Sequence, residues 1–203
     1  MKININRLGI SVLIALIICV STSIVGFEAK CDDLRNNVLR LHILANSDSE
    51  QDQNLKLLVR DAILHSDTVN FETCTNLEQA KSQAKKSITK IRDIAEDTIN
   101  LNGYDYDVTV SIDESYFDTR VYDDFTMPAG VYDAVIVKIG RAEGKNWWCV
   151  MFPALCLPTS DCENLSNYVK NDSAEIALQP QKFQIRFKTV EIYQQIKKNL
   201  SKM

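Results

Sequence analysis

Histidines and cysteines are the residues whose types could support nucleophilic catalysis in this chain. A cysteine nucleophile needs a nearby base, usually a histidine, and the chain offers only His42 and His65. His42 falls on the polar side of a predicted strand, and His65 ends a predicted helix. There is no GxSxG, HExxH or phosphate-binding glycine motif. We therefore predict no catalytic residues. The alternative is a secreted cysteine-dependent hydrolase of the cell envelope, with Cys149 or Cys156 as its nucleophile.

The six cysteines favour neither a metal site nor a complete set of disulfides. Cys19 lies in an apolar N-terminal run, and the other five, an odd number, cannot all pair within one chain. Cys149 and Cys156 are close enough in sequence to form a disulfide, although two buried free thiols fit the pattern equally well. Zinc is disfavoured because there is no CxxC pair and the histidines are far from the cysteines. We expect no metal, no cofactor and no small-molecule substrate.

Acidic residues between 105 and 124 offer oxygen atoms that calcium would accept, but their spacing is not that of an EF-hand loop. Asp105, Asp107 and Asp113 alternate with apolar residues of a predicted strand. They are better explained as the solvated face of a sheet edge, where charge also opposes edge-to-edge aggregation.

Two adjacent tryptophans, Trp147 and Trp148, must point to opposite faces of a predicted strand. One can lie in the core, whereas the other needs a second layer, a partner or solvent. Burial beneath a helix on each side would account for both. A protein-binding hot spot is the sharper interpretation, because tryptophan is enriched in such spots.

The N-terminus is typical of an export signal. Lys2 and Arg7 precede an uncharged apolar run at 8–25, and none of the 27 acidic residues occurs before Glu28. The run suits a cleaved signal peptide, and counted to Phe27 it is also long enough to span a bilayer. We divide the chain into a signal peptide or anchor at 1–30 and one exported domain at 31–203. An anchored structural module of the envelope is a third possibility if the leader is never cut.

Charge is divided unevenly between these parts. The segment before Glu28 carries a net charge of +2. Because the whole chain carries −4, the remainder carries −6. An acidic body argues against nucleic-acid binding.

Periodicity places these residues on an α+β fold with a mostly antiparallel sheet, two early helices and a C-terminal helix. Capping boxes at Ser47/Glu50 and Thr75/Glu78 predict helix starts. The sequence predicts helices at 50–64, 77–101, about 161–169 and about 193–200. It predicts strands at 38–45, 106–113, 116–125, 131–139, 147–152 and 183–187, with 140–146 as a hairpin-like turn.

Several separated blocks resemble a known family. LRLHILANSDS at 39–49, Asp52-Gln53 and LLVRDA at 57–62 are similar to the N-terminal signature of stage II sporulation protein R. PAGVYDAV at 128–135, GKNWWCVMFP at 144–153 and the following Cys156 resemble its second block. The likeness spans roughly 35–160.

The resemblance implies an intercellular signal of endospore formation rather than an enzyme. Such a protein is exported from the forespore into the intermembrane space. There it activates a membrane-embedded aspartic protease of the mother cell, which then matures the early mother-cell sigma factor. No family site residues carry over. As a hypothesis from the residues themselves, we expect the receptor contacts to include Asn46, Ser47, Asp48, Asp52, Trp147 and Trp148.

Overall fold

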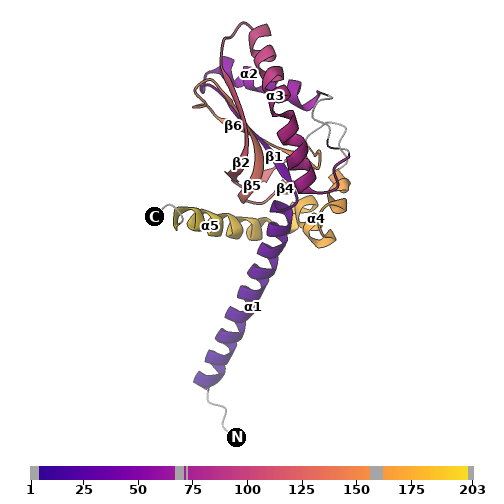
Figure 1. Ribbon diagram of the computed structural model, residues 1–203. Coiled ribbons are helices and arrows are strands. Elements are labelled where there is room, and N and C mark those ends of the chain that lie inside the picture. Colours follow the sequence, from indigo (N-terminus) through magenta and orange to yellow (C-terminus); the bar gives the residue numbers. More distant parts are fainter. Residues whose placement is uncertain (1–4, 67–70, 72, 156–161, 201–203) are drawn as a thin grey trace.

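A computed structural model describes residues 5–66, 71, 73–155 and 162–200. Figure 1 shows a folded body from which one long helix projects. In chain order the elements are α1 (Ile5–Arg35), β1 (Leu39–Leu44), α2 (Glu50–Leu64), α3 (Leu77–Leu101), β2 (Val108–Phe117), β3 (Arg120–Val121), β4 (Thr126–Met127), β5 (Gly130–Ile139), β6 (Asn146–Phe152), η2 (Cys162–Asn167), α4 (Asn171–Leu178), η3 (Pro180–Lys182) and α5 (Gln184–Leu200).

The main sheet has the strand order β2-β5-β1-β6. β1 runs parallel to β5 and antiparallel to β6, and β2 runs antiparallel to β5. The predicted α+β class is confirmed. The predicted hairpin between 131–139 and 147–152 is wrong, because β1 lies between β5 and β6. Strands are about 4.8 Å apart, so the connection at 140–146 spans about 10 Å to pass over the end of β1.

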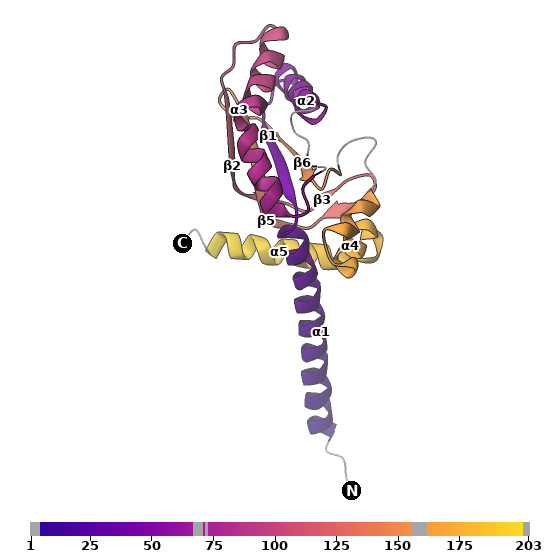
Figure 2. The same ribbon diagram turned by 45° about the vertical axis from the view of Figure 1, so that its right-hand side comes forward.

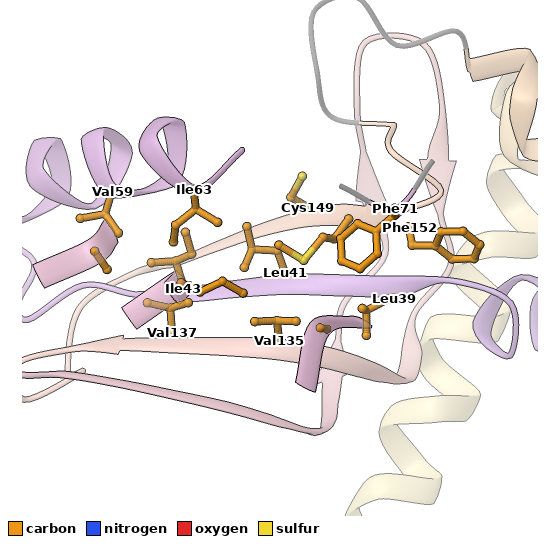
Figure 3. Close-up of a cluster of buried hydrophobic side chains, with 14 of the residues drawn as sticks. Leu39, Leu41, Ile43, Val59, Ile63, Phe71, Val135, Val137, Cys149 and Phe152 are labelled. Carbon is orange, nitrogen blue, oxygen red and sulfur yellow. The ribbon is translucent and has the colours of Figure 1, made fainter. Parts of the chain in front are cut away.

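The first face of the sheet packs against α2 and α3. Leu41 and Ile43 of β1 and Val135 and Val137 of β5 are buried there, and Figure 3 shows them lying between the sheet and the neighbouring helices. α3 contributes Ala80, Ala84, Ile91, Ala95 and Ile99, one stripe at helical spacing. Because the apolar residues of α2 and α3 recur on one side, sequence periodicity located both helices.

The second face is covered mainly over the half nearest α1. The end of α1, the helices α4 and α5 and the β3–β4 ribbon form a second buried cluster there, including Phe27, Cys31, Leu34, Phe117, Tyr132, Val150, Ala177 and Phe187. Arg35 joins α1 to the sheet: its Nη1 donates to the Ala129 carbonyl at 2.7 Å and its Nη2 pairs with Glu28. α1 therefore continues past the expected boundary at residue 30, and its last turns belong to the body.

The rest of α1 stands free of the body. The apolar side chains between Ile10 and Val25 are exposed, and the helix is long and apolar enough to cross a membrane. A signal sequence and an anchor both have this character.

Four local predictions were wrong. The predicted strand at 183–187 is the start of α5, where the buried residues Phe187, Val190 and Gln194 have helical spacing. The predicted strand at 116–125 divides into the end of β2 and the short β3. The caps are Ser49 and Asn76, which accept from the backbone amides of Asp52 and Gln79. Ser, Asn and Thr occur at neighbouring positions near each helix start and cap a helix about equally well. The sequence alone therefore did not identify the capping residue.

The edge strand β2 agrees with the interpretation of the acidic stretch. β2 borders the sheet, and Asp105, Asp107 and Asp113 are exposed. Among the described residues, no three potential metal ligands cluster.

Gly144 should be intolerant of a side chain, because a Cβ there would overlap the backbone carbonyl of Ser47. We expect Gly144→Ala to lower the free energy of unfolding by about 1–3 kcal/mol, the usual cost of overpacking a site that cannot relax. Urea unfolding of the full chain in mild detergent, followed by tryptophan fluorescence, measures this. Glu143→Ala, at an exposed neighbour, should change it by less than about 0.5 kcal/mol. Equal stability of the two variants would contradict the prediction.

Candidate partner-binding site

The segment from Asn46 to Asp52 links β1 to α2 through hydrogen bonds centred on Asp52. The Oδ2 atom of Asp52 accepts from Asn46 Nδ2 at 2.9 Å and from Ser47 Oγ at 2.5 Å. The side chain is 5% exposed, and its backbone amide donates to the Ser49 cap. These carboxylate contacts hold the turn in one shape.

The same segment fastens the connection between β5 and β6. Asn46 Oδ1 accepts from the backbone amide of Arg141 at 3.0 Å, and Asp48 Oδ1 accepts from that of Lys145 at 2.7 Å. The buried Lys56, which sequence reasoning missed, donates to the Lys145 carbonyl at 2.9 Å. The predicted contact residues Asn46, Ser47 and Asp52 therefore use their polar atoms inside the molecule, and only Asp48 among the four is exposed.

The electrostatics of Asp52 follow from these contacts. Burial by itself raises the pKa of a carboxyl group, because it disfavours the charged form. Hydrogen bonds from Ser47, Asn46 and Tyr106 outweigh burial, so the pKa of Asp52 lies below its ordinary value.

Trp147 and Trp148 lie on opposite faces of β6, as the strand period predicted. Trp147 packs on the first face, where the guanidinium of Arg60 from α2 lies 4.4 Å from its ring centroid. Trp148 lies on the second face against the ring of Phe117 and under Arg120 of β3, at 4.8 Å. Both rings are half-buried. Helix α2 covers part of Trp147, whereas the two-stranded ribbon borders Trp148.

Arg40 is a buried cation on the second face, beside the pair formed by His42 and Trp148 in the sheet register. Its Nε donates to the Cys149 carbonyl at 3.0 Å, its Nη2 donates to Tyr122 Oη at 2.7 Å, and its guanidinium lies 4.3 Å from the Phe117 ring centroid. Tyr122 in turn donates to the Trp148 carbonyl. No carboxylate in the described part of the chain forms an ion pair with Arg40. Its burial depends on the β3–β4 ribbon, which comes much later in the chain.

In the part of the chain that the structure describes, no helix covers the half of the second face farthest from α1. We call this surface the open face; it is formed by His42, Ser115, Ile136, Asn146 and Trp148, which are half-buried or exposed and lie on one side of four neighbouring strands. Asp113 and Lys138 extend it at its exposed margin.

A hydrogen-bonded chain crosses the open face. His42 Nε2 lies 2.9 Å from Asn146 Oδ1, and His42 Nδ1 lies 3.3 Å from Ser115 Oγ. Burial lowers the pKa of His42. A neutral ring that donates from Nε2 to Asn146 and accepts at Nδ1 from Ser115 satisfies both contacts, so the chain fixes one orientation of the imidazole.

Cys149 does not share this face. It is buried beside Leu41 and Phe152 in the first cluster and is disulfide-bonded, so it is not a free thiol near His42. Cys156 lies outside the described residues, and its pairing with Cys149 stays a prediction.

Replacing Asp52 should produce a pH-dependent loss of stability. Asp52→Asn keeps the shape but removes the charge, and we expect a loss of about 1–2 kcal/mol near pH 7, the difference between charged and neutral hydrogen bonds. A depressed pKa contributes stability that is complete above the ordinary value of 3.8 and is lost as pH falls through the lower folded value. The difference between wild type and variant should therefore shrink towards pH 3.

Unfolding free energies at pH 7 and pH 3 provide the measurement. Glu50→Gln, an exposed neutralisation in the same helical turn, should show no comparable effect. A difference that stays constant between the two pH values would refute the role given to the Asp52 charge.

The chain was compared with known proteins. The family profile of stage II sporulation protein R matches residues 35–162. The stage II sporulation protein R of Bacillus subtilis (strain 168) is 39% identical over 121 residues, which cover 60% of this chain and 54% of that protein. The aligned part thus spans about half the length of this relative. No solved structure matches the chain. The matched region contains β1, the Asn46–Asp52 turn and the open face, and by that match the chain belongs to the stage II sporulation protein R family.

Proposed function

We propose that this protein is an exported sporulation signal that activates a membrane-embedded aspartic protease of the mother cell, which then matures the early mother-cell sigma factor. In this proposal it is made in the forespore, acts in the intermembrane space and works by binding rather than by catalysis. Membership of a sporulation family carries the proposal. The apolar helix α1 supports export, since Lys2 and Arg7 favour a cytoplasmic N-terminus and hence a body on the far side.

The shape of the molecule supports a contact at a distance from its own membrane. β1 begins close to the end of α1 and runs away from it, so the end of β1 and the β5–β6 connection lie towards the end of the body opposite α1 (Figure 1). If α1 anchors the chain, that end points across the intermembrane space. A receptor in the opposite membrane would meet it first.

We place the receptor contact on the open face, around Trp148. A half-buried tryptophan bordered by Arg120, His42 and Asn146 combines apolar area with polar groups, as binding hot spots do. Asp48, in the turn before α2, and Trp147, on the opposite face of β6, remain candidates outside the open face. Asn46, Ser47 and Asp52 would act indirectly, by holding the turn and the connection that carries Asn146.

Binding would activate the protease by shifting its population towards an active state. A ligand shifts such an equilibrium only by its differential affinity for the two states. The open face must therefore fit the active receptor better than the inactive one, and stabilising an active dimer is one way to achieve this.

Reconstitution in a non-sporulating bacterium tests the function. The exported chain, the candidate protease and its pro-sigma substrate are co-expressed, and processing is followed by immunoblot. We expect processing only when the chain is present and carries its leader. Absence of processing with all three proteins expressed and correctly located would overturn the proposed function.

Two matched charge reversals test the contact surface in the same assay. Lys138→Glu changes the exposed margin of the open face, and Lys86→Glu makes the same change on the outer side of α3. Because both positions are exposed, each should leave the free energy of unfolding within about 0.5 kcal/mol. We expect Lys138→Glu to reduce processing severalfold and Lys86→Glu to leave it unchanged. If both variants supported equal processing, the proposal that the receptor binds the open face would be wrong.

A further inference from the structure

Helix α5 carries a second apolar stripe that the body does not cover. Its inner side, with Phe187, Val190 and Gln194, is buried. Its outer side presents Ile185, Ile192, Ile196 and Leu200, which are 85%, 50%, 54% and 66% exposed. These four residues are seven, four and four positions apart, so they share one side of an α-helix. Tyr193, also exposed, borders them.

The inner side fixes α5 against α1 at the point where α1 leaves the body. The Phe27 ring lies 5.3 Å from that of Phe187, and Gln194 Nε2 donates to Glu28 Oε1 at 2.6 Å. Two residues before Phe27, Val25 is 69% exposed and belongs to the apolar run of α1. α5 therefore packs against α1 within two residues of the exposed apolar run of α1.

The direction of α5 matches a membrane surface. In Figures 1 and 2, which differ by a turn about the vertical axis, α5 runs across α1 beneath the sheet. A helix that crosses a membrane-spanning helix at its point of exit lies along the plane of the bilayer.

The charge of α5 also suits a bilayer with anionic lipids. The helix has four basic residues, Arg186, Lys188, Lys197 and Lys198, and one acidic residue, Glu191. The part of the chain that follows α1's apolar run is acidic overall, so this basic helix is an exception within it. Basic residues beside an apolar stripe are the composition of helices that lie in the membrane interface.

We propose that α5 lies on the bilayer that α1 enters, with Ile185, Ile192, Ile196 and Leu200 immersed at the boundary between head groups and acyl chains. This gives the protein a second membrane contact outside the matched family region, and it orients the body relative to the membrane. It does not depend on the identity of the receptor. A second copy of the chain is disfavoured as the occupant, because α5 is packed at the end of the apolar run of α1 that the bilayer would surround.

The test uses the full chain in nanodiscs of phosphatidylethanolamine and phosphatidylglycerol, with one chain per disc. Ile196→Cys in a Cys19→Ser background is labelled with the fluorophore NBD, and dithionite bleaches any label that water reaches. Gln195→Cys is the matched control, because the adjacent exposed residue points about 100° away around the helix. The Cys19→Ser chain without an added cysteine measures labelling elsewhere.

We expect the label at position 196 to bleach severalfold more slowly than the label at 195. Since both side chains are exposed, neither substitution removes a core contact, and circular dichroism confirms that each variant is folded. Equal bleaching at the two positions would overturn the proposal. Slow bleaching at 196 that appears only with two chains per disc would also overturn it, because a second copy would then cover the stripe.

Discussion

The passage of the β5–β6 connection over the end of β1 is the constraint on which the rest of this structure depends. β1 must lie between two strands that come much later in the chain, so the six residues that connect them, 140–145, have to cross its end closely. Asn46 and Asp48 provide side-chain acceptors for backbone amides of that segment, and Gly144 lets it approach Ser47 without a side chain in between. Asp52 holds the turn that supplies these groups.

This constraint explains why two distant sequence blocks occur together. The block at 39–62 forms the central strand and the turn, and the block at 128–153 forms the strands on both sides and the connection between them. Strand alternation places the two tryptophans on opposite faces of the sheet, and the meeting of the two blocks decides what covers each of them. Trp147 joins the helix-covered core, whereas Trp148 borders an open surface supported from below by the buried guanidinium of Arg40. The groups best placed to contact a partner are therefore held by a rigid support.

The other organising contact joins the body to α1. Arg35 bridges the Ala129 carbonyl and Glu28, and Glu28 accepts from Gln194 of α5. The last turns of α1 consequently move with the sheet and with α5 as one packed unit. A body attached in this way would have a defined orientation in the membrane arrangement that we propose, with the open face away from the bilayer and α5 beside it.

Local patterns in the sequence by themselves determined the apolar N-terminal helix, the helices α2 and α3 and most strand positions, because apolar runs and hydrophobic period are encoded within short segments. They also placed Trp147 and Trp148 on opposite faces. Only the tertiary structure decided that β1 separates β5 from β6, that Arg40 is buried and that His42 meets Ser115 and Asn146. These contacts join residues 73 to 109 positions apart. It also decided that residues 184–187 are helical, because a short alternation fits a strand equally well until the burial of Phe187, Val190 and Gln194 selects the helical spacing. Pairing between distant segments follows from how buried faces fit together, and no local period encodes that fit.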